Sequence, residues 1–398
     1  MGVYEAEDDS KLLLNCAKEY LTKTNKEEQL DILEIGVGSG FVLSELAKEF
    51  PLHKYFGSDI NKDALQSTKQ LFQKNKQKVT LKQSNLFEKW KKNKFDLILF
   101  NTPYLPLEDE ENFEELSMED KALYGGKEGN EVTLDFLKAL PSHLKEKGKT
   151  LIITSSLAKP ERIEQRAKEL LLETKIIKTS PSFFEEILCI DIKKTYLLEK
   201  LSKEKITEID YFSKGKKSQV YKGKFHKKDI IIKLGKEDDL QVEKIFLKKL
   251  EHTKFTPKLI GKQYSGAILM SYVKGENIEQ FLKNNTNKKE ISQILNSCLA
   301  HCYTLDSLKI TKKEMTNPYK HIIIDDKANV TFIDFERALY NDNPKNTRQF
   351  LQYLCRQSKN LQKKGIVLDT DKIREQAKAH KEKPQKIRLQ TFLENKIT

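Results

Sequence analysis

Short apolar segments alternate with amphipathic segments along the first 200 residues. Runs of strand length follow one another, and stretches with apolar residues at helical spacing separate most of them. The expected strands are 30–35, 55–60, 79–83, 95–100, 150–154, 175–178 and 187–192, and the expected helices are 41–50, 64–74, 131–145 and 161–172. This rhythm predicts an α/β fold, with a mostly parallel sheet covered by helices on both faces and an antiparallel hairpin at its end.

The second half of the chain has a different pattern. Short strand-like stretches within 209–233 surround a polar turn, a helix is expected at 240–250, and another strand at 267–275. A β-hairpin is expected from 322–324 and 330–333. The polar segment 198–208 separates the two patterns. We therefore predict two domains, residues 1–200 and residues 201–398.

Charge differs between the two halves. The net charge is +13, but residues 1–200 carry 31 Lys and Arg against 35 Asp and Glu, whereas residues 201–398 carry 41 against 24. Of the 72 basic residues, 65 are Lys. Arg reads bases and phosphates better than Lys, so this usage does not favour a dedicated DNA-binding protein. Contact with RNA or the ribosome, if it occurs, is expected through the basic second half.

Composition also argues against membrane and secreted classes of protein. No apolar run reaches the roughly 18 residues that a bilayer span needs. The first ten residues are acidic and lack the apolar core of a signal peptide. The five Cys are scattered and form no C-x-x-C pair, which indicates reduced thiols. We expect a cytoplasmic protein that does not contact membranes.

A glycine-rich turn follows the first expected strand. The sequence LEIGVGSG (33–40) places glycines between a strand and a helix. Glycine lets the backbone approach a nucleoside closely, and a helix N-terminus adds N–H donors. Asp59 ends the next strand, where a carboxylate can hold both ribose hydroxyls. A tight strand–helix turn without a ligand is the alternative interpretation.

The spacing G-x-G-x-G resembles that of class I S-adenosylmethionine (SAM) methyltransferases, in which no pyrophosphate is bound. The resemblance implies a Rossmann-like fold with SAM as cofactor. It also places Asn85, in the segment after the third expected strand, near the adenine of SAM. The cofactor-binding candidates are Glu34, Gly36, Gly38, Gly40, Asp59 and Asn85.

The segment FNTPY (100–104) follows the fourth expected strand and resembles the (N/D)PPY signature of amino-group methyltransferases. An amide nitrogen is a poor nucleophile because its lone pair is conjugated. The Asn101 side-chain oxygen and the Thr102 backbone carbonyl can accept both N–H hydrogens, which turns the lone pair toward the methyl group. Tyr104, after Pro103, can stack on the planar group. Thr102 replaces the first proline, so we expect a less rigid loop. A simple Asn-Pro turn is the alternative.

Two more segments narrow the resemblance. VYEAEDDS (3–10) resembles the VYEPAEDS start of HemK-like glutamine methyltransferases of the archaeal and eukaryotic release-factor branch, and YGGKEG (124–129) resembles the AGGxxG segment of that branch. The resemblance covers nearly all of residues 3–195. It implies a protein-glutamine N-methyltransferase of translation termination, which methylates the glutamine of a Gly-Gly-Gln motif in a peptide release factor. It also implies a small zinc-binding activator as partner.

The same FNTPY segment is compatible with a different acceptor, the N6 amine of adenine in RNA or DNA. That reaction needs a flipped or single-stranded base and a basic groove. The acidic balance of residues 1–200 disfavours it, as do the six acidic residues within 108–115.

In the second half Lys233 ends an expected strand, Glu243 lies on the next expected helix, and DFE (334–336) follows the expected hairpin. With these residues the second half resembles a reduced protein kinase, similar to RIO-like and archaeal predicted Ser/Thr kinases. The resemblance implies a small two-lobed α+β domain that binds ATP, with Mg²⁺ held by the Asp of a DFG-like sequence, here DFE (334–336). Candidate ATP and metal residues are Gly215, Val220, Lys233, Glu243 and Asp334.

No HRD sequence is present, so a pseudokinase that tethers the enzyme to the translation apparatus is the alternative to an active Ser/Thr kinase. Glu314 is a candidate substitute base. Cys298, His301 and Cys302 share one helix face, where packing against the core is favoured over zinc binding, and no metal is assigned to them.

Overall fold

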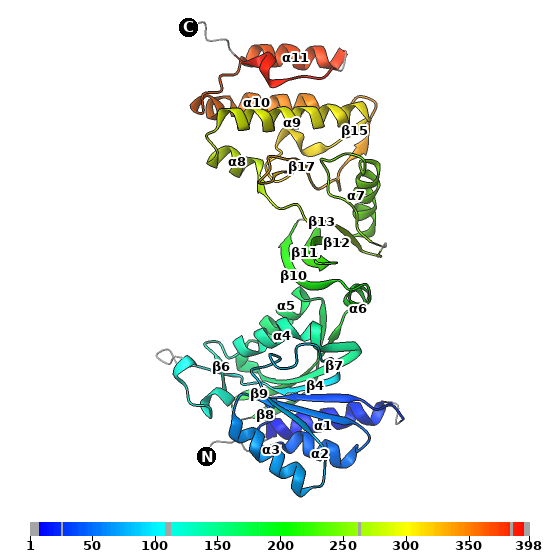
Figure 1. Cartoon of the computed structure of the whole chain (residues 1–398), viewed down its shortest axis with the longest axis vertical. Coiled ribbons are helices and arrows are strands. Elements are labelled where there is room, and N and C mark those ends of the chain that lie inside the picture. The colour runs from blue at the N-terminus through cyan, green and yellow to red at the C-terminus, as the bar shows by residue number, and fades with distance from the viewer. Residues whose placement is uncertain are drawn as a thin grey trace. The chain divides into compact units, whose positions relative to one another are not determined.

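The computed structural model describes residues 8–24, 27–107, 113–182, 184–215, 217–261, 264–382 and 385–393 of the 398 (Figure 1). The chain folds into two compact units, Met1–Asp210 and Tyr211–Thr398. The division expected at residue 200 stays a prediction. Most of the VYEAEDDS segment, at 1–7, and most of the acidic stretch, at 108–112, lie outside the described residues.

The first unit is built on a seven-stranded sheet with the order β3-β2-β1-β4-β7-β9-β8. Its first five strands pair in parallel, and β9 pairs antiparallel with both β7 and β8. The strands are β1 (Asp31–Ile35), β2 (Lys54–Asp59), β3 (Thr80–Gln83), β4 (Phe95–Asn101), β7 (Leu144–Ser155), β8 (Leu172–Ser182) and β9 (Glu185–Lys194). The predicted mostly parallel sheet with an antiparallel end is confirmed.

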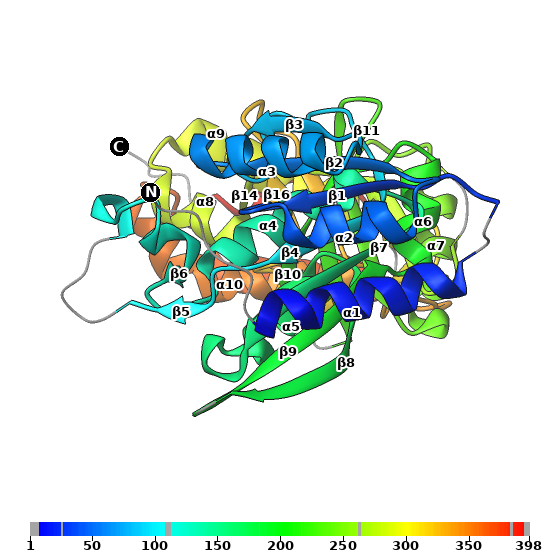
Figure 2. The same ribbon diagram turned by 90° about the horizontal axis from the view of Figure 1, so that it is seen from below.

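Helices cover both faces of this sheet, as predicted. Figure 1 shows α1, α2 and α3 on one side and α4 and α5 on the other, and Figure 2 shows α1 beside α2. The helices are α1 (Asp8–Lys23), α2 (Phe41–Glu49), α3 (Lys62–Lys74), α4 (Glu131–His143), α5 (Pro160–Glu169) and α6 (Tyr196–Lys203). Two short strands, β5 (Leu105–Pro106) and β6 (Tyr124–Gly126), pair outside the main sheet. Covered on both faces, β4 buries Leu97, Ile98 and Leu99 completely.

Helix α1 was absent from the elements expected from the sequence. Leu13, Ala17 and Leu21, spaced four residues apart, are at most 3% exposed and belong to the core under β1, β4 and β7. One face of α1 is therefore fixed against the sheet by apolar burial. This contact decides where the first turn of α1, Asp8–Ser10, lies.

Two predicted helices were too long at their C-terminal ends. Helix α4 ends at His143, because Lys145 already belongs to β7 and its Nζ contacts carboxylate oxygens of Asp31 at 2.6 Å and Asp96 at 2.7 Å. Helix α5 ends at Glu169, because Leu171 adopts the left-handed φ of 56° that breaks a helix before β8 begins.

The second unit combines an antiparallel sheet with helices. The sheet has the order β10-β11-β12-β13, and α7 follows β12. The elements are β10 (Thr207–Lys214), β11 (Ser218–Phe225), β12 (Lys228–Gly235), α7 (Glu237–Lys249) and β13 (Ala267–Ser271). Helix α7 begins three residues before the predicted helix, because Glu237, Asp238 and Asp239 occupy a first turn where acidic groups are favoured.

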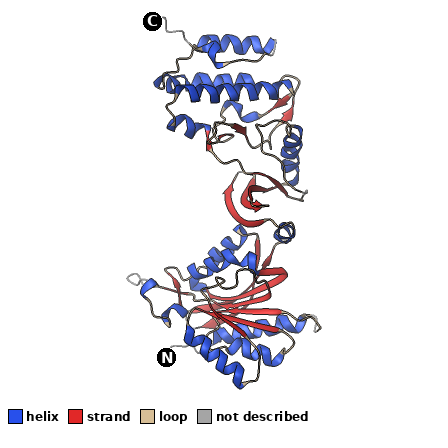
Figure 3. Ribbon diagram, in the orientation of Figure 1, coloured by secondary structure: helices blue, strands red, loops and turns tan. Residues whose placement is uncertain are grey.

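The rest of the second unit is mainly helical, as the blue ribbons of Figure 3 show. Its helices are α8 (Ile278–Asn284), α9 (Lys288–Ser307), α10 (Asn346–Lys363) and α11 (Thr370–Glu382). The predicted hairpin is present as β16 (Ile322–Ile324) and β17 (Val330–Phe332), and β14 (Glu276–Asn277) pairs with β16. A two-stranded sheet joins β15 (Ile310–Thr311) and β18 (Leu339–Tyr340). Across the described ranges, we find no helix with the length and hydropathy of a membrane span.

Candidate functional site

A cavity of about 700 Å³ lies at the carboxyl ends of β1, β2 and β4. The carboxyl ends of parallel strands meet at one edge of a sheet, which is where open α/β folds bind ligands. The volume is typical of a site for a small molecule or cofactor. Nine of the ten predicted methyltransferase site residues line it: Glu34, Gly36, Gly38, Asp59, Asn85, Asn101, Thr102, Pro103 and Tyr104.

The glycine turn is held in shape by its neighbours. Gly36, Gly38 and Gly40 have φ values of 65°, 52° and 82°, which L side chains rarely adopt. The Gly38 N–H donates to Asp59 Oδ2 at 3.0 Å, and its carbonyl accepts from the Thr68 hydroxyl at 3.0 Å. A Cβ on Gly40 would lie 2.8 Å from Thr68 Cγ2. Gly40 thus permits close packing of α2 on α3, and it is not among the described residues that line the cavity.

Two acidic side chains face the cavity, and Glu34 is buried whereas Asp59 is partly exposed. Glu34 is 3% exposed, and its Oε2 finds no hydrogen-bond partner among the described residues. Burial raises the pKa of Glu34 well above its ordinary value, and the nearby Asp59 carboxylate adds to the rise. Burial also raises the pKa of Asp59, against hydrogen bonds from Gly38 and Asn61. A buried acid with one unpartnered oxygen suits a cationic ligand, and SAM carries a sulfonium and an ammonium group.

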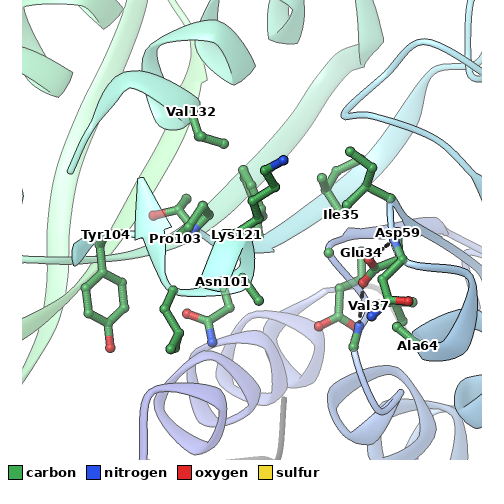
Figure 4. Close-up of a pocket in the computed structure, with 18 of the residues that line it drawn as sticks. Glu34, Ile35, Val37, Asp59, Ala64, Asn101, Pro103, Tyr104, Lys121 and Val132 are labelled. Carbon is green, nitrogen blue, oxygen red and sulfur yellow. Dashed lines mark hydrogen bonds between the residues drawn. The ribbon is translucent and has the colours of Figure 1, made fainter. Parts of the chain in front are cut away.

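The reaction end of the cavity is organised around Asn101, the last residue of β4. Its Nδ2 donates to Asp9 Oδ2 at 3.0 Å, and the Tyr104 hydroxyl donates to the same oxygen at 3.3 Å. Asn101 Oδ1 is buried and has no hydrogen-bond partner among the described residues. Figure 4 shows Asn101 and Tyr104 at one side of the cavity and Glu34 and Asp59 at the other.

Thr102 has a different role from the one expected for a substitute of proline. Its hydroxyl donates to the Ile153 carbonyl at 2.7 Å, its N–H donates to the same oxygen at 3.3 Å, and the residue is 2% exposed. These bonds attach the turn to β7. They restrain the turn, for which the sequence predicted a less rigid loop.

Several lining residues were missed at the level of sequence. Asp9 and Ser10 reach the cavity from α1, Lys121 comes from the segment before β6, and Ser182 and Glu185 come from the β8–β9 hairpin. None of them belongs to a glycine turn or a strand end of the parallel sheet. Asp9 and Ser10 lay within the quoted VYEAEDDS segment, which was the signal that could have found them.

The second unit contains a separate cluster of charges. Lys233 on β12 is 7% exposed, and its Nζ lies 2.7 Å from Glu243 Oε2 on α7, 2.9 Å from Asp334 Oδ1 and 3.2 Å from Glu336 Oε2. Burial opposes the charged ammonium group, but the attraction of Glu243 and Asp334 outweighs it and raises the pKa of Lys233. Asp334 adopts a left-handed φ of 65°, which is uncommon for a residue other than glycine.

The remaining predicted residues of this half are placed as follows. Val220 lies opposite Lys233 in the β11–β12 ladder, and the Gly215 N–H donates to the Ser218 carbonyl at 2.8 Å in the turn before β11. Glu314 accepts from Lys312 Nζ at 3.1 Å. On α9, His301 stacks against Phe255, and burial lowers the pKa of His301 to about 4.

Comparison with known proteins identifies relatives of the first unit. A family model described as "Methyltransferase small domain" matches residues 5–116. The chain is 36% identical over 189 residues to a putative protein N5-glutamine methyltransferase of Methanocaldococcus jannaschii, covering 48% of this chain and 90% of that protein. It is 30% identical over 161 residues to the eRF1 methyltransferase catalytic subunit of Schizosaccharomyces pombe, covering 37% of this chain and 69% of that protein.

A bacterial relative is matched over a smaller part. The release factor glutamine methyltransferase of Geobacter sulfurreducens is 32% identical over 120 residues, which cover 29% of this chain and 42% of that protein. The chain therefore spans less than half of this bacterial relative, but nearly the whole archaeal one.

The buried acid Glu34 leads to a prediction about pH and stability. In the unfolded chain Glu34 titrates near its ordinary pKa of 4.5, whereas its pKa in the fold is raised. Between these two pKa values the folded state holds a proton that the unfolded state has lost, so the free energy of unfolding falls as pH rises through this window. Because Gln does not titrate, Glu34→Gln removes this loss. Relative to the unaltered chain, its free energy of unfolding should rise by about 1.4 kcal/mol for each pH unit between the two pKa values.

Urea unfolding at pH 5 and pH 8 without SAM measures this effect. Trp90 is the only tryptophan of the chain, it is 1% exposed and it lies in the first unit, so its fluorescence reports on that unit. We expect the stability gain of Glu34→Gln to be larger at pH 8. Exposed Glu88→Gln is the matched control. An equal gain for Glu34→Gln at both pH values would contradict the raised pKa.

Proposed function

The chain belongs to the protein N5-glutamine methyltransferase family, whose methyl donor is SAM, and from this premise we propose that its first unit methylates the glutamine side-chain amide in the Gly-Gly-Gln motif of a peptide release factor. The unpartnered Asn101 Oδ1 carries this proposal, because a buried acceptor at the end of β4 matches the N–H donors of a primary amide. The names of the fission-yeast and Geobacter relatives, which act on release factors, support the acceptor.

Residues at one end of the cavity bind the methyl donor, and residues at the other end orient the glutamine amide. Glu34 and Asp59 offer carboxyl oxygens that accept hydrogen bonds at the inner end, and the glycine turn lets a nucleoside approach the backbone. Asn101 Oδ1 and the Thr102 carbonyl accept the two N–H hydrogens of the glutamine amide, which turns the nitrogen lone pair toward the donor. Tyr104 packs against the planar amide. SAM supplies the electrophilic methyl group when it is bound.

The proposed methyl transfer needs no general base from the protein. The amide nitrogen forms a bond to the methyl carbon as the carbon–sulfur bond breaks, and the sulfonium leaves as a neutral thioether. The nitrogen then loses one proton to water. The residues of this chain contribute by orienting the amide, which accounts for the barrier reduction.

The first test is methyl transfer from labelled SAM to a purified release factor. We expect label in a factor that contains Gly-Gly-Gln and none when that glutamine is changed to alanine. Asn101→Ala should lower kcat by roughly 10²-fold, because it removes a preorganised acceptor. Asn93→Ala, at an exposed position just before β4, is the matched control and should keep full activity.

An RNA arm and a DNA arm test the alternative acceptor. Label in adenine of either nucleic acid, with none in the release factor, would overturn the proposal in favour of an adenine N6 methyltransferase. Acidic side chains in the cavity wall, among them Asp9 and Asp59, disfavour this outcome, because carboxylates repel a phosphate backbone.

We also propose a small zinc-binding activator as partner of the first unit. The resemblance of residues 3–10 to the archaeal and eukaryotic branch supports it, as does the name of the fission-yeast relative, a catalytic subunit. Methylation by the chain alone, unchanged after addition of such a protein, would count against this partner.

For the second unit we propose ATP binding in the manner of a protein kinase. The observation that favours it is the buried Lys233–Glu243 pair beside Asp334, since kinases hold the α- and β-phosphates with a strand Lys paired to a helix Glu and hold Mg²⁺ with the DFG Asp. Glu243 Oε1 also accepts from the Phe335 N–H at 3.0 Å, which ties α7 to the DFE segment. Phosphoryl transfer and a tethering pseudokinase both remain compatible with this arrangement.

Nucleotide binding tests this proposal directly. Lys233→Arg keeps a positive charge beside three acids but cannot place it as Lys does, so we expect ATP affinity to fall by about tenfold or more. Lys228→Met, exposed on the same strand, is the control. Labelled ATP binding measured with Mg²⁺ gives the readout. Absence of ATP binding to the unaltered chain would sink the proposal, and release of labelled phosphate to a protein would separate kinase from pseudokinase.

A further inference from the structure

Helix α1 carries an acidic side chain into the cavity wall at the reaction end. Asp9 lies in the first turn of α1, where a helix N-terminus favours negative charge, and it is 5% exposed. The apolar face of α1 packs in the core under the sheet, so the position of this turn is fixed. Asp8, its neighbour, points outward and has a side chain that is 90% exposed.

Three donors converge on the two oxygens of Asp9. Oδ2 accepts from Asn101 Nδ2 at 3.0 Å and from the Tyr104 hydroxyl at 3.3 Å. Oδ1 accepts from the Ser10 N–H at 2.5 Å. Asn101 Nδ2 also lies 3.4 Å from the Ser10 hydroxyl oxygen. Asp9 thus connects the two side chains of the FNTPY segment that face the substrate.

The chemistry of these contacts fixes which way the Asn101 amide points. The two ends of an amide have almost the same shape, so packing alone does not distinguish oxygen from nitrogen. A carboxylate only accepts hydrogen bonds, so it selects the NH₂ end of Asn101. The oxygen is thereby left at the opposite end, where it is buried and unpartnered. Turned over, Asn101 would present N–H hydrogens to the N–H hydrogens of the substrate.

We propose that Asp9 is a positioning residue for the methyl transfer, which holds Asn101 and Tyr104 in the orientation that receives a primary amide. Asp9 acts through Asn101 and Tyr104 and does not itself exchange a proton. This inference rests on the proposed glutamine methylation. It adds a residue of α1 to a site whose other proposed residues lie at the carboxyl ends of strands.

Asp9→Asn is the sharpest variant, because it keeps the shape and replaces one acceptor by a donor. If the new NH₂ faces Ser10, it opposes the Ser10 N–H; if it faces Asn101, the Asn101 amide must turn over. Neither arrangement satisfies both neighbours and leaves Asn101 Oδ1 toward the substrate. We expect kcat for release-factor methylation to fall by roughly 10- to 100-fold, with the KM for SAM nearly unchanged.

A double-mutant cycle separates positioning from a general structural role. In the Asn101→Ala background, Asp9→Asn should lower kcat by a clearly smaller factor than in the unaltered chain, because Tyr104 is then the only group that Asp9 still orients. Asp8→Asn, on the exposed neighbour, should leave kcat unchanged in both backgrounds. Full-sized losses from Asp9→Asn in both backgrounds, or wild-type kcat in the single variant, would overturn the inference.

A spectroscopic readout covers the case in which the double variant is too slow to measure. In a chain labelled with ¹⁵N-asparagine, the side-chain amide resonance of Asn101 is the one that Asn101→Ala removes. It should shift in Asp9→Asn and stay in place in Asp8→Asn, and an unshifted resonance in Asp9→Asn contradicts the inference. If the unaltered enzyme does not methylate the release factor at all, the proposed function fails; if it does and Asp9→Asn keeps full activity, only the inference fails.

Discussion

The convergence of strand ends at one edge of the parallel sheet is the constraint on which the first unit depends. Residues 34–40, Asp59 and residues 101–104 are separated by up to 70 positions in the sequence, yet they lie at the carboxyl ends of β1, β2 and β4, which are neighbours in the sheet. Each strand therefore delivers its last side chains to the same cavity. β4 is held in place because it is buried on both faces and pairs with β1 on one side and β7 on the other.

Much of this arrangement could be predicted, because it rests on local patterns. Runs of apolar residues gave the strands, and a residue that follows a parallel strand lies at its carboxyl edge wherever the strand sits in the sheet. Residues contributed from outside this pattern could not be placed in the same way. Asp9 reaches the cavity only because α1 packs beneath the sheet, a tertiary contact that no periodicity within residues 1–10 reveals. Gly40 shows the converse case, since the motif marks it like its neighbours whereas the fold uses it to bring α2 close to Thr68.

Thr102 illustrates how a departure from a motif is absorbed. A proline restricts the turn through its ring, and Thr102 restricts it through two hydrogen bonds to one carbonyl of β7. What the (N/D)PPY signature requires at this position is a backbone carbonyl that is held in place. Both a proline and the hydrogen-bonded Thr102 meet this requirement. Such a replacement is invisible in the sequence, because it depends on the Ile153 carbonyl in a strand about 50 residues away.

The two units differ in whether their buried charged groups have partners, and this difference bears on the ligand proposed for each unit. In the first unit Glu34 is buried with an unpartnered oxygen, and burial of such a group costs free energy that a bound cationic ligand would offset. In the second unit three acids, Glu243, Asp334 and Glu336, lie around Lys233, and Lys312 adds a second positive charge near Asp334. That excess of negative charge is compatible with an anionic nucleotide only if a divalent cation enters with it, since phosphate alone would be repelled. ATP binding to this unit is thus expected to require Mg²⁺, whereas SAM needs no ion to satisfy Glu34.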